Sequence, residues 1–219
     1  MSQPASVRQR SVGLCGSPTW ALAIVTVAII GPLLYQSASS SVPSSSAVLR
    51  VDHRSTAIEA DGALRDGVTV FDDRYPGVAN LDRHLLQALR QAATDAADDG
   101  VEFYVNSGWR SPAYQNRLLR EAVSKYGSEE EAARWVATAD TSAHVSGNAV
   151  DIGPVDATAW LSERGARYGL CQIYSNEPWH YELRPQAIDH GCPPMYADPT
   201  HDPRMRQRSA LAVDPVPTA

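Results

Sequence analysis

Two separate segments of the chain carry residues that become useful together only if the fold brings the segments to one place. The first segment contains His144 and Asp151, and the second contains Glu177 and His180. Two neutral imidazoles and one carboxylate form a ligand set that leaves a tetrahedral Zn²⁺ one open position for water. A further carboxylate beside such a site can accept the proton of that water. We therefore expect His144, Asp151 and His180 to bind Zn²⁺, with Glu177 as the base of a hydrolase.

The spacing within the first segment suits convergence on one point. Residues 148–152 alternate as a strand does, which places Val150 in a core and Asp151 on the opposite face, toward a cleft. Gly147 allows the backbone to turn so that His144 returns toward Asp151. A single histidine is more often a core or surface residue, and a single aspartate is more often a cap or turn residue. Their combination around a glycine favours metal binding.

The second segment is not a helical metalloprotease motif. Pro178 pushes the backbone of Glu177 toward extended geometry, and the chain contains no His-Glu-x-x-His sequence. Glu177 and His180 can both reach one cleft only if Pro178 introduces a bend. Taken alone, Glu177 would more often be a solvated loop carboxylate.

Length, composition and charge restrict the class of protein. The chain has 219 residues and a net charge of −6, and 43% of its residues are hydrophobic. This composition supports one globular domain with a core, flanked by tails. The acidic balance argues against a nucleic acid as partner, because such a partner requires clustered lysine and arginine.

The N-terminal region predicts a membrane segment. No charged residue lies between Arg10 and Arg50, and residues 20–35 are almost wholly apolar. Arg8 and Arg10 precede this run, so the positive-inside bias places the N-terminus in the cytoplasm and the domain outside the cell membrane. The run is slightly short of a hydrocarbon core of roughly 30 Å, so its length does not separate an anchor from a cleaved signal peptide. We favour the uncleaved anchor because the cleavage pattern is weak.

The rest of the chain divides by composition into a serine-rich linker, a folded domain and a proline-containing tail. The predicted parts are a cytoplasmic N-terminal tail (1–18), a transmembrane anchor or signal segment (19–36), the linker (37–50), the zinc-binding domain (51–196) and a disordered C-terminal tail (197–219).

Capping residues and apolar spacing predict the elements of the domain. Asn80 is a candidate N-cap for a helix that stops before Gly100, and Ser111 and Ser128 are candidate caps for two more helices. We expect a further helix at 157–167 and strands at 101–105, 148–152, 170–174 and 180–183. Because helices and strands mix without a regular βαβ rhythm, we expect an α+β fold with a small antiparallel sheet and packed helices.

Arg110 lies in a loop between a predicted strand and a predicted helix, where functional side chains are common. Taken alone, Arg110 is more often a surface ion-pair partner. Its planar guanidinium suits a carboxylate or a developing oxyanion better than a lysine would.

Three sequence blocks occur together and in order across roughly residues 81–183. They are Ser107-Gly108-Trp109-Arg110-Ser111 followed by Gln115, then Ser142-x-His144-x-x-Gly147-x-Ala149-x-Asp151, then Glu177-x-Trp179-His180-Tyr181. Their combination resembles the zinc D-alanyl-D-alanine carboxypeptidases, a family that includes the vancomycin-resistance carboxypeptidases and dipeptidases. The resemblance implies the hedgehog/DD-peptidase α+β fold and cleavage at the end of peptidoglycan stem peptides.

The same resemblance implies roles for individual residues. It implies that His144, Asp151 and His180 are the zinc ligands and that Glu177 is the general base, which are the roles already expected from their chemistry. It implies that Arg110 binds the transition state or the substrate carboxylate, and that Ser142 and Gln115 contact substrate. Trp179 is a candidate for the substrate cleft as well, although aromatic residues pack in cores about as often.

These observations favour a membrane-tethered zinc D,D-carboxypeptidase that acts, as a monomer, on stem peptides ending in D-Ala-D-Ala. One alternative is a related zinc endopeptidase or D,D-dipeptidase on the same scaffold. An alternative of another class is a cell-wall binding module that has lost turnover. An intact Glu177 and Arg110 argue against the binding module, because a module that only binds does not need a base beside an open metal position.

Cys171 and Cys192 flank the second segment and lie on the predicted exported side, where oxidation is allowed. We expect a disulfide between them. The alternative is two buried free cysteines.

Overall fold

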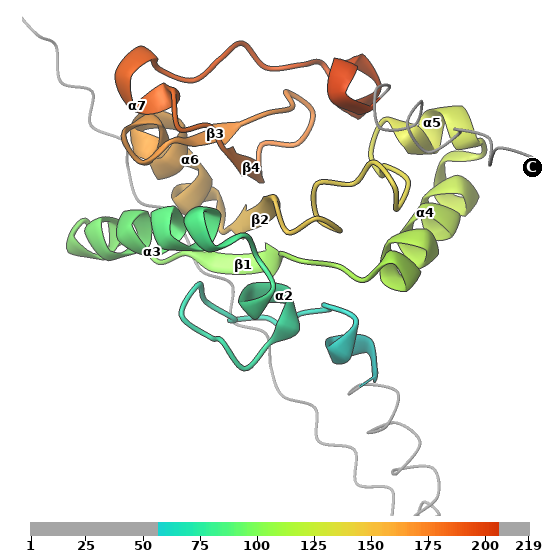
Figure 1. The fold of residues 1–219 in the computed structure, drawn as a ribbon, viewed down its shortest axis with the longest axis horizontal. Helices are drawn as coiled ribbons and strands as arrows, with labels where there is room; N and C mark the ends of the chain where they lie inside the picture. The colour runs from blue at the N-terminus through green and yellow to red at the C-terminus, as the bar shows by residue number, and fades with distance from the viewer. Residues whose placement is uncertain (1–56, 206–219) are drawn as a thin grey trace, which may run out of the picture. The chain divides into compact units, whose positions relative to one another are not determined.

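The computed structural model describes residues 57–205, which form helices around a four-stranded sheet (Figure 1). The strands are β1 (Tyr104–Ser107), β2 (Ala149–Gly153), β3 (Leu170–Gln172) and β4 (His180–Leu183). The helices are α2 (Pro76–Ala79), α3 (Arg83–Asp98), α4 (Pro112–Tyr126), α5 (Glu129–Ala133), α6 (Val155–Arg164) and α7 (Ala187–His190), with 3-10 helices η1 (Gly165–Tyr168) and η2 (Pro199–His201).

The sheet is antiparallel throughout, with strand order β1-β2-β4-β3. Its central pair, β2 and β4, is in a register that places Asp151 opposite His180 and Val150 opposite Tyr181. The predicted α+β class with a small antiparallel sheet is confirmed. Because β2 and β4 come from the two segments singled out in the sequence, their pairing brings those segments together.

The hydrophobic core joins the sheet to α3 and α6. Leu85 and Leu89 of α3 cluster with Val150 and Ile152 of β2, and none of these four residues is more than 1% exposed. Trp160 of α6 belongs to the same cluster. Each buried side chain of this kind contributes about 1.5–3 kcal/mol, so β2 is held firmly. Helices α4 and α5 pack against each other at the end of the domain away from α6 (Figure 1).

The N-cap of α3 is Asp82 rather than the predicted Asn80. The Asp82 carboxylate accepts hydrogen bonds from the backbone N–H groups of His84 and Leu85, which satisfies two donors of the first turn. Asn80 instead follows the last residue of α2. Asn80 and Asp82 are both of residue types that cap helices. Because Asn80 ends α2, Asp82 is the residue that caps α3.

The other two predicted caps are confirmed. Ser111 accepts a hydrogen bond from the first turn of α4, and Pro112 is the first residue of that helix. Gly127 ends α4 with a φ of 87°, a left-handed conformation that favours glycine. Ser128 caps α5 in the same way as Ser111 caps α4.

Some element boundaries differ from the prediction. β1 begins at Tyr104, where it meets Gly153 of β2, rather than at residue 101. β3 ends at Gln172, because Tyr174 instead forms a parallel bridge with Tyr196. The helix expected at 157–167 begins two residues earlier as α6 and continues as η1.

Residues 197–205 are folded, whereas the disordered tail was predicted to begin at 197. This segment contains η2, and its Asp198 and Asp202 are 1% and 0% exposed. The Tyr174 hydroxyl donates a hydrogen bond to Asp202 at 3.0 Å. The prolines that suggested disorder are compatible with this structure, because Pro199 is the first residue of η2, where no backbone N–H is needed.

The predicted disulfide is present. It joins Cys171 of β3 to Cys192, with a sequence separation of 21. The bond therefore ties the edge of the sheet to the chain that leads into the C-terminal segment.

The predicted tail, membrane segment and linker, residues 1–18, 19–36 and 37–50, lie outside the described residues. Within residues 57–205, no helix combines the length and the apolar character needed to cross a membrane.

Candidate metal centre

Strand pairing and one tight turn place the predicted ligands together. Asp151 of β2 lies opposite His180 of β4. His144 lies in the loop before β2, which turns at Gly147 with a φ of 74°. A Cβ atom at Gly147 would lie 2.6 Å from the backbone oxygen of Asn80, so this turn requires glycine.

The ligand atoms of His144, Asp151 and His180 all lie within 4.8 Å of one another, and the three residues are buried. Asp151 Oδ1 is 3.4 Å from His144 Nε2 and 3.3 Å from His180 Nδ1. Within the described residues, neither Asp151 Oδ1 nor His180 Nδ1 has a hydrogen-bond partner. Buried polar atoms without partners are rare in folded proteins and mark places where an ion or water belongs.

The remaining ring nitrogens determine which lone pairs face the cluster. His144 Nδ1 lies 2.8 Å from the carbonyl oxygen of Gly108, which can only accept, so Nδ1 carries the proton and Nε2 keeps its lone pair. His180 Nε2 lies 3.3 Å from the Glu182 carboxylate, which can only accept, so Nε2 carries a proton and Nδ1 is the nitrogen left to bind a metal. Each imidazole therefore turns its metal-binding nitrogen toward Asp151.

The electrostatics of the cluster favour a cation. Burial, followed by the positive charge of Arg110, lowers the pKa of His144, which keeps this imidazole neutral. Burial alone would raise the pKa of Asp151, but the two histidines and Arg110 hold it well below its usual range. At His180, burial lowers the pKa, yet the carboxylates of Asp151 and Glu182 outweigh it and raise the pKa to about 9. The negative charge that attracts a proton to His180 would equally attract a metal ion.

These observations fit a zinc site. Two imidazole nitrogens and one carboxylate oxygen are a donor set that Zn²⁺ accepts with a fourth position left open. The unpartnered Asp151 Oδ1 and His180 Nδ1 are the atoms that a cation would satisfy.

Glu177 lies beside the cluster and is buried. Its Oε2 is 3.6 Å from His180 Nδ1, and its Oε1 has no hydrogen-bond partner within the described residues. The backbone N–H of His180 donates to the Glu177 carbonyl at 3.0 Å, so the bend required at Pro178 is present. Burial raises the pKa of Glu177 to about 7. Such a pKa suits a group that accepts and returns a proton near neutral pH.

Arg110 is held in a fixed orientation by three acceptors. Its Nε donates to Ser107 Oγ at 2.8 Å, one terminal nitrogen donates to Gln115 Oε1 at 3.2 Å, and the other donates to Asp151 Oδ2 at 2.9 Å. The buried Gln115 in turn donates to the carbonyl of Ala137 at 2.8 Å. Gln115, expected to contact substrate, is therefore also a support for Arg110.

A cavity of about 550 Å³ opens onto the cluster. Its lining includes all of the predicted catalytic, ligand and substrate residues, namely Arg110, Gln115, Ser142, His144, Asp151, Glu177, Trp179 and His180. Trp179 lines this cavity and is 39% exposed, whereas Tyr181, two residues later in the chain, is buried in the core.

The fold and the cluster can be compared with known proteins. Residues 78–186 match the family model for VanY, described as D-alanyl-D-alanine carboxypeptidase. Residues 78–186 thus form a domain of the VanY family. It is also 32% identical to a D-alanyl-D-alanine carboxypeptidase of Enterococcus faecalis over 126 residues, which cover 46% of this chain and 47% of that protein. The chain thus spans about half the length of this curated relative.

Two solved structures of similar proteins were also found. One is VanYB in complex with D-alanine-D-alanine, which is 30% identical with a TM-score of 0.47 and covers 51% of this chain and 74% of its own. The other is a variant of the vancomycin-resistance D,D-pentapeptidase VanY in complex with Zn(II), which is 30% identical with a TM-score of 0.45 and covers 47% of this chain and 72% of its own.

The region that matches VanY contains every predicted site residue from Arg110 to His180, but it ends before residues 197–205. Sequence reasoning missed three residues around His180, namely Tyr174, Glu182 and Arg204. Glu182 had a detectable signal, since strand alternation places it on the same face as His180. Arg204 had none, because it lies in a segment whose prolines suggested disorder.

Proposed function

We propose that this chain is a zinc-dependent D-alanyl-D-alanine carboxypeptidase that hydrolyses the terminal D-Ala of peptidoglycan stem peptides, on a hedgehog/DD-peptidase-like fold. The observation that carries the proposal is the buried cluster of His144, Asp151 and His180, whose facing atoms lack hydrogen-bond partners. The VanY-family domain and the relative in Enterococcus faecalis support the substrate class.

His144, Asp151 and His180 would hold the zinc ion, which when bound lowers the pKa of a water and polarises a peptide carbonyl. Glu177 accepts the proton of the attacking water on Oε1, the oxygen that has no partner in the described residues. With a pKa raised by burial to about 7, the protonated Glu177 can then deliver this proton to the leaving amine.

Arg110 stabilises negative charge on the substrate. Three of its guanidinium N–H groups are engaged by Ser107, Gln115 and Asp151. A guanidinium has five such groups, so two are left for the carbonyl oxygen or the terminal carboxylate of a substrate in the cavity. The three existing bonds fix its orientation before substrate arrives, which avoids a reorganisation cost during the reaction.

The test is the identity of the product. The purified full-length protein is incubated with a stem pentapeptide ending in D-Ala-D-Ala, untreated, after chelation and after adding back Zn²⁺. We expect free D-Ala, lost on chelation and restored by Zn²⁺. An internal cut or release of a dipeptide would assign the chain to the endopeptidases or dipeptidases instead, and no product with bound zinc would assign it to the wall-binding modules.

We further propose that residues 19–36 anchor the domain on the outer face of the cell membrane. The uncharged run after Arg8 and Arg10 supports this orientation. The disulfide supports it as well, because such bonds persist in oxidising compartments. Added protease should digest the domain on cells without an outer barrier, and alkaline washing should leave the chain in the membrane. Recovery of a shortened soluble domain would indicate a cleaved signal.

A further inference from the structure

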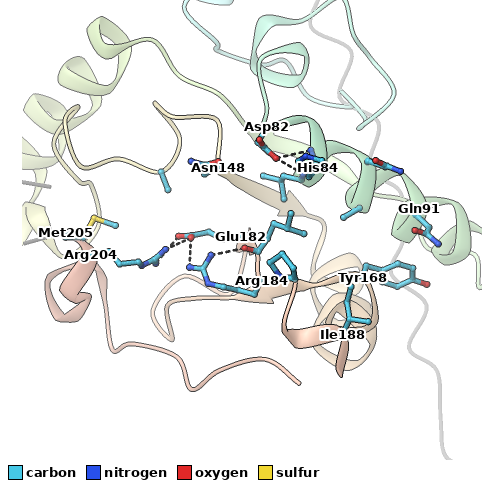
Figure 2. A pocket seen from close by; sticks show the side chains of 16 residues that line it. Asp82, His84, Gln91, Asn148, Tyr168, Glu182, Arg184, Ile188, Arg204 and Met205 are labelled. Carbon is cyan, nitrogen blue, oxygen red and sulfur yellow. Dashed lines mark hydrogen bonds and ion pairs between the residues drawn. The ribbon is translucent and has the colours of Figure 1, made fainter. Parts of the chain in front are cut away.

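A second cavity, of about 700 Å³, lies on the other side of the residues that support His180. Glu182 lines this second cavity, whereas His180 lines the catalytic one. Figure 2 shows Arg184 and Arg204 directed toward Glu182 within it. Glu182 therefore stands between the candidate metal centre and a pair of arginines that no part of the proposed mechanism uses.

The Glu182 carboxylate divides its contacts between these two sides. It is 2% exposed, and its Oε1 lies 3.3 Å from His180 Nε2. Its Oε2 accepts hydrogen bonds from Arg204 at 2.7 Å and from Arg184 at 2.6 Å, and Arg204 also donates to Oε1 at 3.3 Å. A buried carboxylate needs such partners to remain ionised, and an ionised carboxylate is the stronger acceptor for an imidazole N–H.

Arg204 is in turn held in place by the carboxylate of Asp202. Its Nε donates to both oxygens of Asp202, at 3.0 and 2.9 Å, and Asp202 also accepts the hydroxyl hydrogen bond of Tyr174. The Tyr174 ring lies 5.1 Å from the His180 ring, measured between centroids. The contacts thus run in a closed path from His180 through Glu182, Arg204, Asp202 and Tyr174 back to His180.

We propose that Arg204 is a positioning residue that holds Glu182 so that Glu182 fixes the ring orientation and tautomer of His180 for metal binding. The inference rests on the proposed zinc-dependent function. Arg204 lies beyond residues 78–186, the region that matches the family model, so the C-terminal segment of this chain completes the support of its metal centre. Partners that orient a ligating histidine typically change metal affinity by about 10–100-fold.

The first variant is Arg204→Met, which keeps much of the apolar stem and removes the guanidinium. The readout is the dissociation constant for Zn²⁺ of the purified full chain, measured by competition with a chromophoric chelator and without substrate. We expect binding weaker by about 10–100-fold. Arg204→Lys restores the charge without the planar fork, so its affinity should fall between those of Arg204→Met and the wild type.

Arg134→Met is the matched control. Arg134 Nε donates to Asp198 at 3.1 Å, so this change also removes an arginine–carboxylate contact of the C-terminal segment, but one that does not touch Glu182. Zinc affinity should remain at the wild-type value. An equal loss in Arg134→Met would show that any loosening of the segment weakens the site, and it would overturn the specific role of Arg204.

Glu182→Gln gives a second, independent variant, because it keeps an acceptor oxygen while removing the charge. Nitrogen chemical shifts of the His180 ring, measured on the metal-free proteins at a pH above the pKa of this ring, where the imidazole is neutral, should report one tautomer, protonated at Nε2, in the wild type and a mixture in Glu182→Gln and Arg204→Met. Wild-type zinc affinity and a single tautomer in both variants would contradict the proposal. A wild-type chain that binds zinc but releases no D-Ala would contradict the proposed function alone, since this affinity comparison needs no turnover.

Discussion

Asp151 Oδ1 lies 3.3 Å from His180 Nδ1, and within the described residues neither atom has a hydrogen-bond partner although both residues are buried. The register of β2 against β4 fixes this relationship, because the two residues lie directly opposite each other. Arg110 binds the other oxygen of Asp151 at 2.9 Å, which leaves Oδ1 free to face the two imidazoles. The fold thus holds a carboxylate oxygen and two imidazole nitrogens in an arrangement that suits a divalent cation.

Glu177→Gln should bind zinc normally and lose turnover. The amide keeps the size of the side chain but cannot accept the proton of the attacking water, and general-base catalysis typically contributes about 10²–10⁴-fold. Zinc content and kcat measured on the same preparation check this. Full turnover with zinc bound would remove Glu177 from the mechanism.

Arg110→Ala should reduce kcat for release of D-Ala by about 10²–10³-fold, the usual effect of losing one oxyanion donor. Because Arg110 also pairs with the buried Asp151, the metal-free variant should lose stability, on the order of 3 kcal/mol. Arg117→Ala is the control, since Arg117 of α4 stacks on Tyr114 and makes no contact with the predicted ligands. Unchanged kcat in Arg110→Ala would contradict the assigned role.

Reduction of the Cys171–Cys192 disulfide should destabilise the domain by about 3 kcal/mol, because a loop with a sequence separation of 21 is released in the unfolded chain. Urea unfolding of the purified protein with and without reductant measures this difference. A Cys171→Ser, Cys192→Ser double variant should match the reduced protein and should not respond to reductant. Equal midpoints for oxidised and reduced wild type would show that the bond does not constrain the unfolded state.

Asp198 should make the stability of the domain depend on pH. Burial raises the pKa of Asp198, but hydrogen bonds from Thr200, His201 and Arg134 outweigh it and lower the pKa to about 2. A carboxylate whose folded-state pKa is depressed stabilises the fold above its unfolded pKa of about 3.9, and this contribution is lost as the pH falls toward 2.

The measurement for Asp198 is the free energy of unfolding of Asp198→Asn and wild type between about pH 7 and pH 2. Near pH 7 the variant should be less stable by on the order of 1 kcal/mol, since its partner Arg134 is half-exposed and partly screened. The difference should shrink toward pH 2. Asp140→Asn, at an exposed position, should match the wild type throughout, and a difference for Asp198→Asn that does not change with pH would contradict the assignment.

Local patterns predicted the parts of the fold that local physics determines. The alternation in residues 148–152, the proline after Ser111 and the glycine at 127 each describe backbone conformations that neighbouring residues impose, and the structure has them. The cap of α3 was placed at Asn80 instead of Asp82, because two capping residues lie close together and only the packing of α2 distinguishes them.

The support of the candidate centre could not be predicted in the same way. Arg204 reaches Glu182 across 22 positions of the chain, and nothing in its neighbourhood identifies its partner. Its segment is held by buried carboxylates at Asp198 and Asp202, whose pairing depends on tertiary contacts. The amino-acid composition suggested a disordered tail from residue 197, because composition shows the prolines of this segment but carries no information about its tertiary contacts.

Zinc content per chain is the most direct test of the account. The wild-type protein and His84→Ala, which changes an exposed histidine outside the cluster, should each hold about one Zn²⁺ per chain after dialysis against a slight excess of the metal. His144→Ala and His180→Ala should hold almost none. A wild-type chain without zinc, or a His180→Ala variant that retains as much zinc as the wild type, would contradict the central claim.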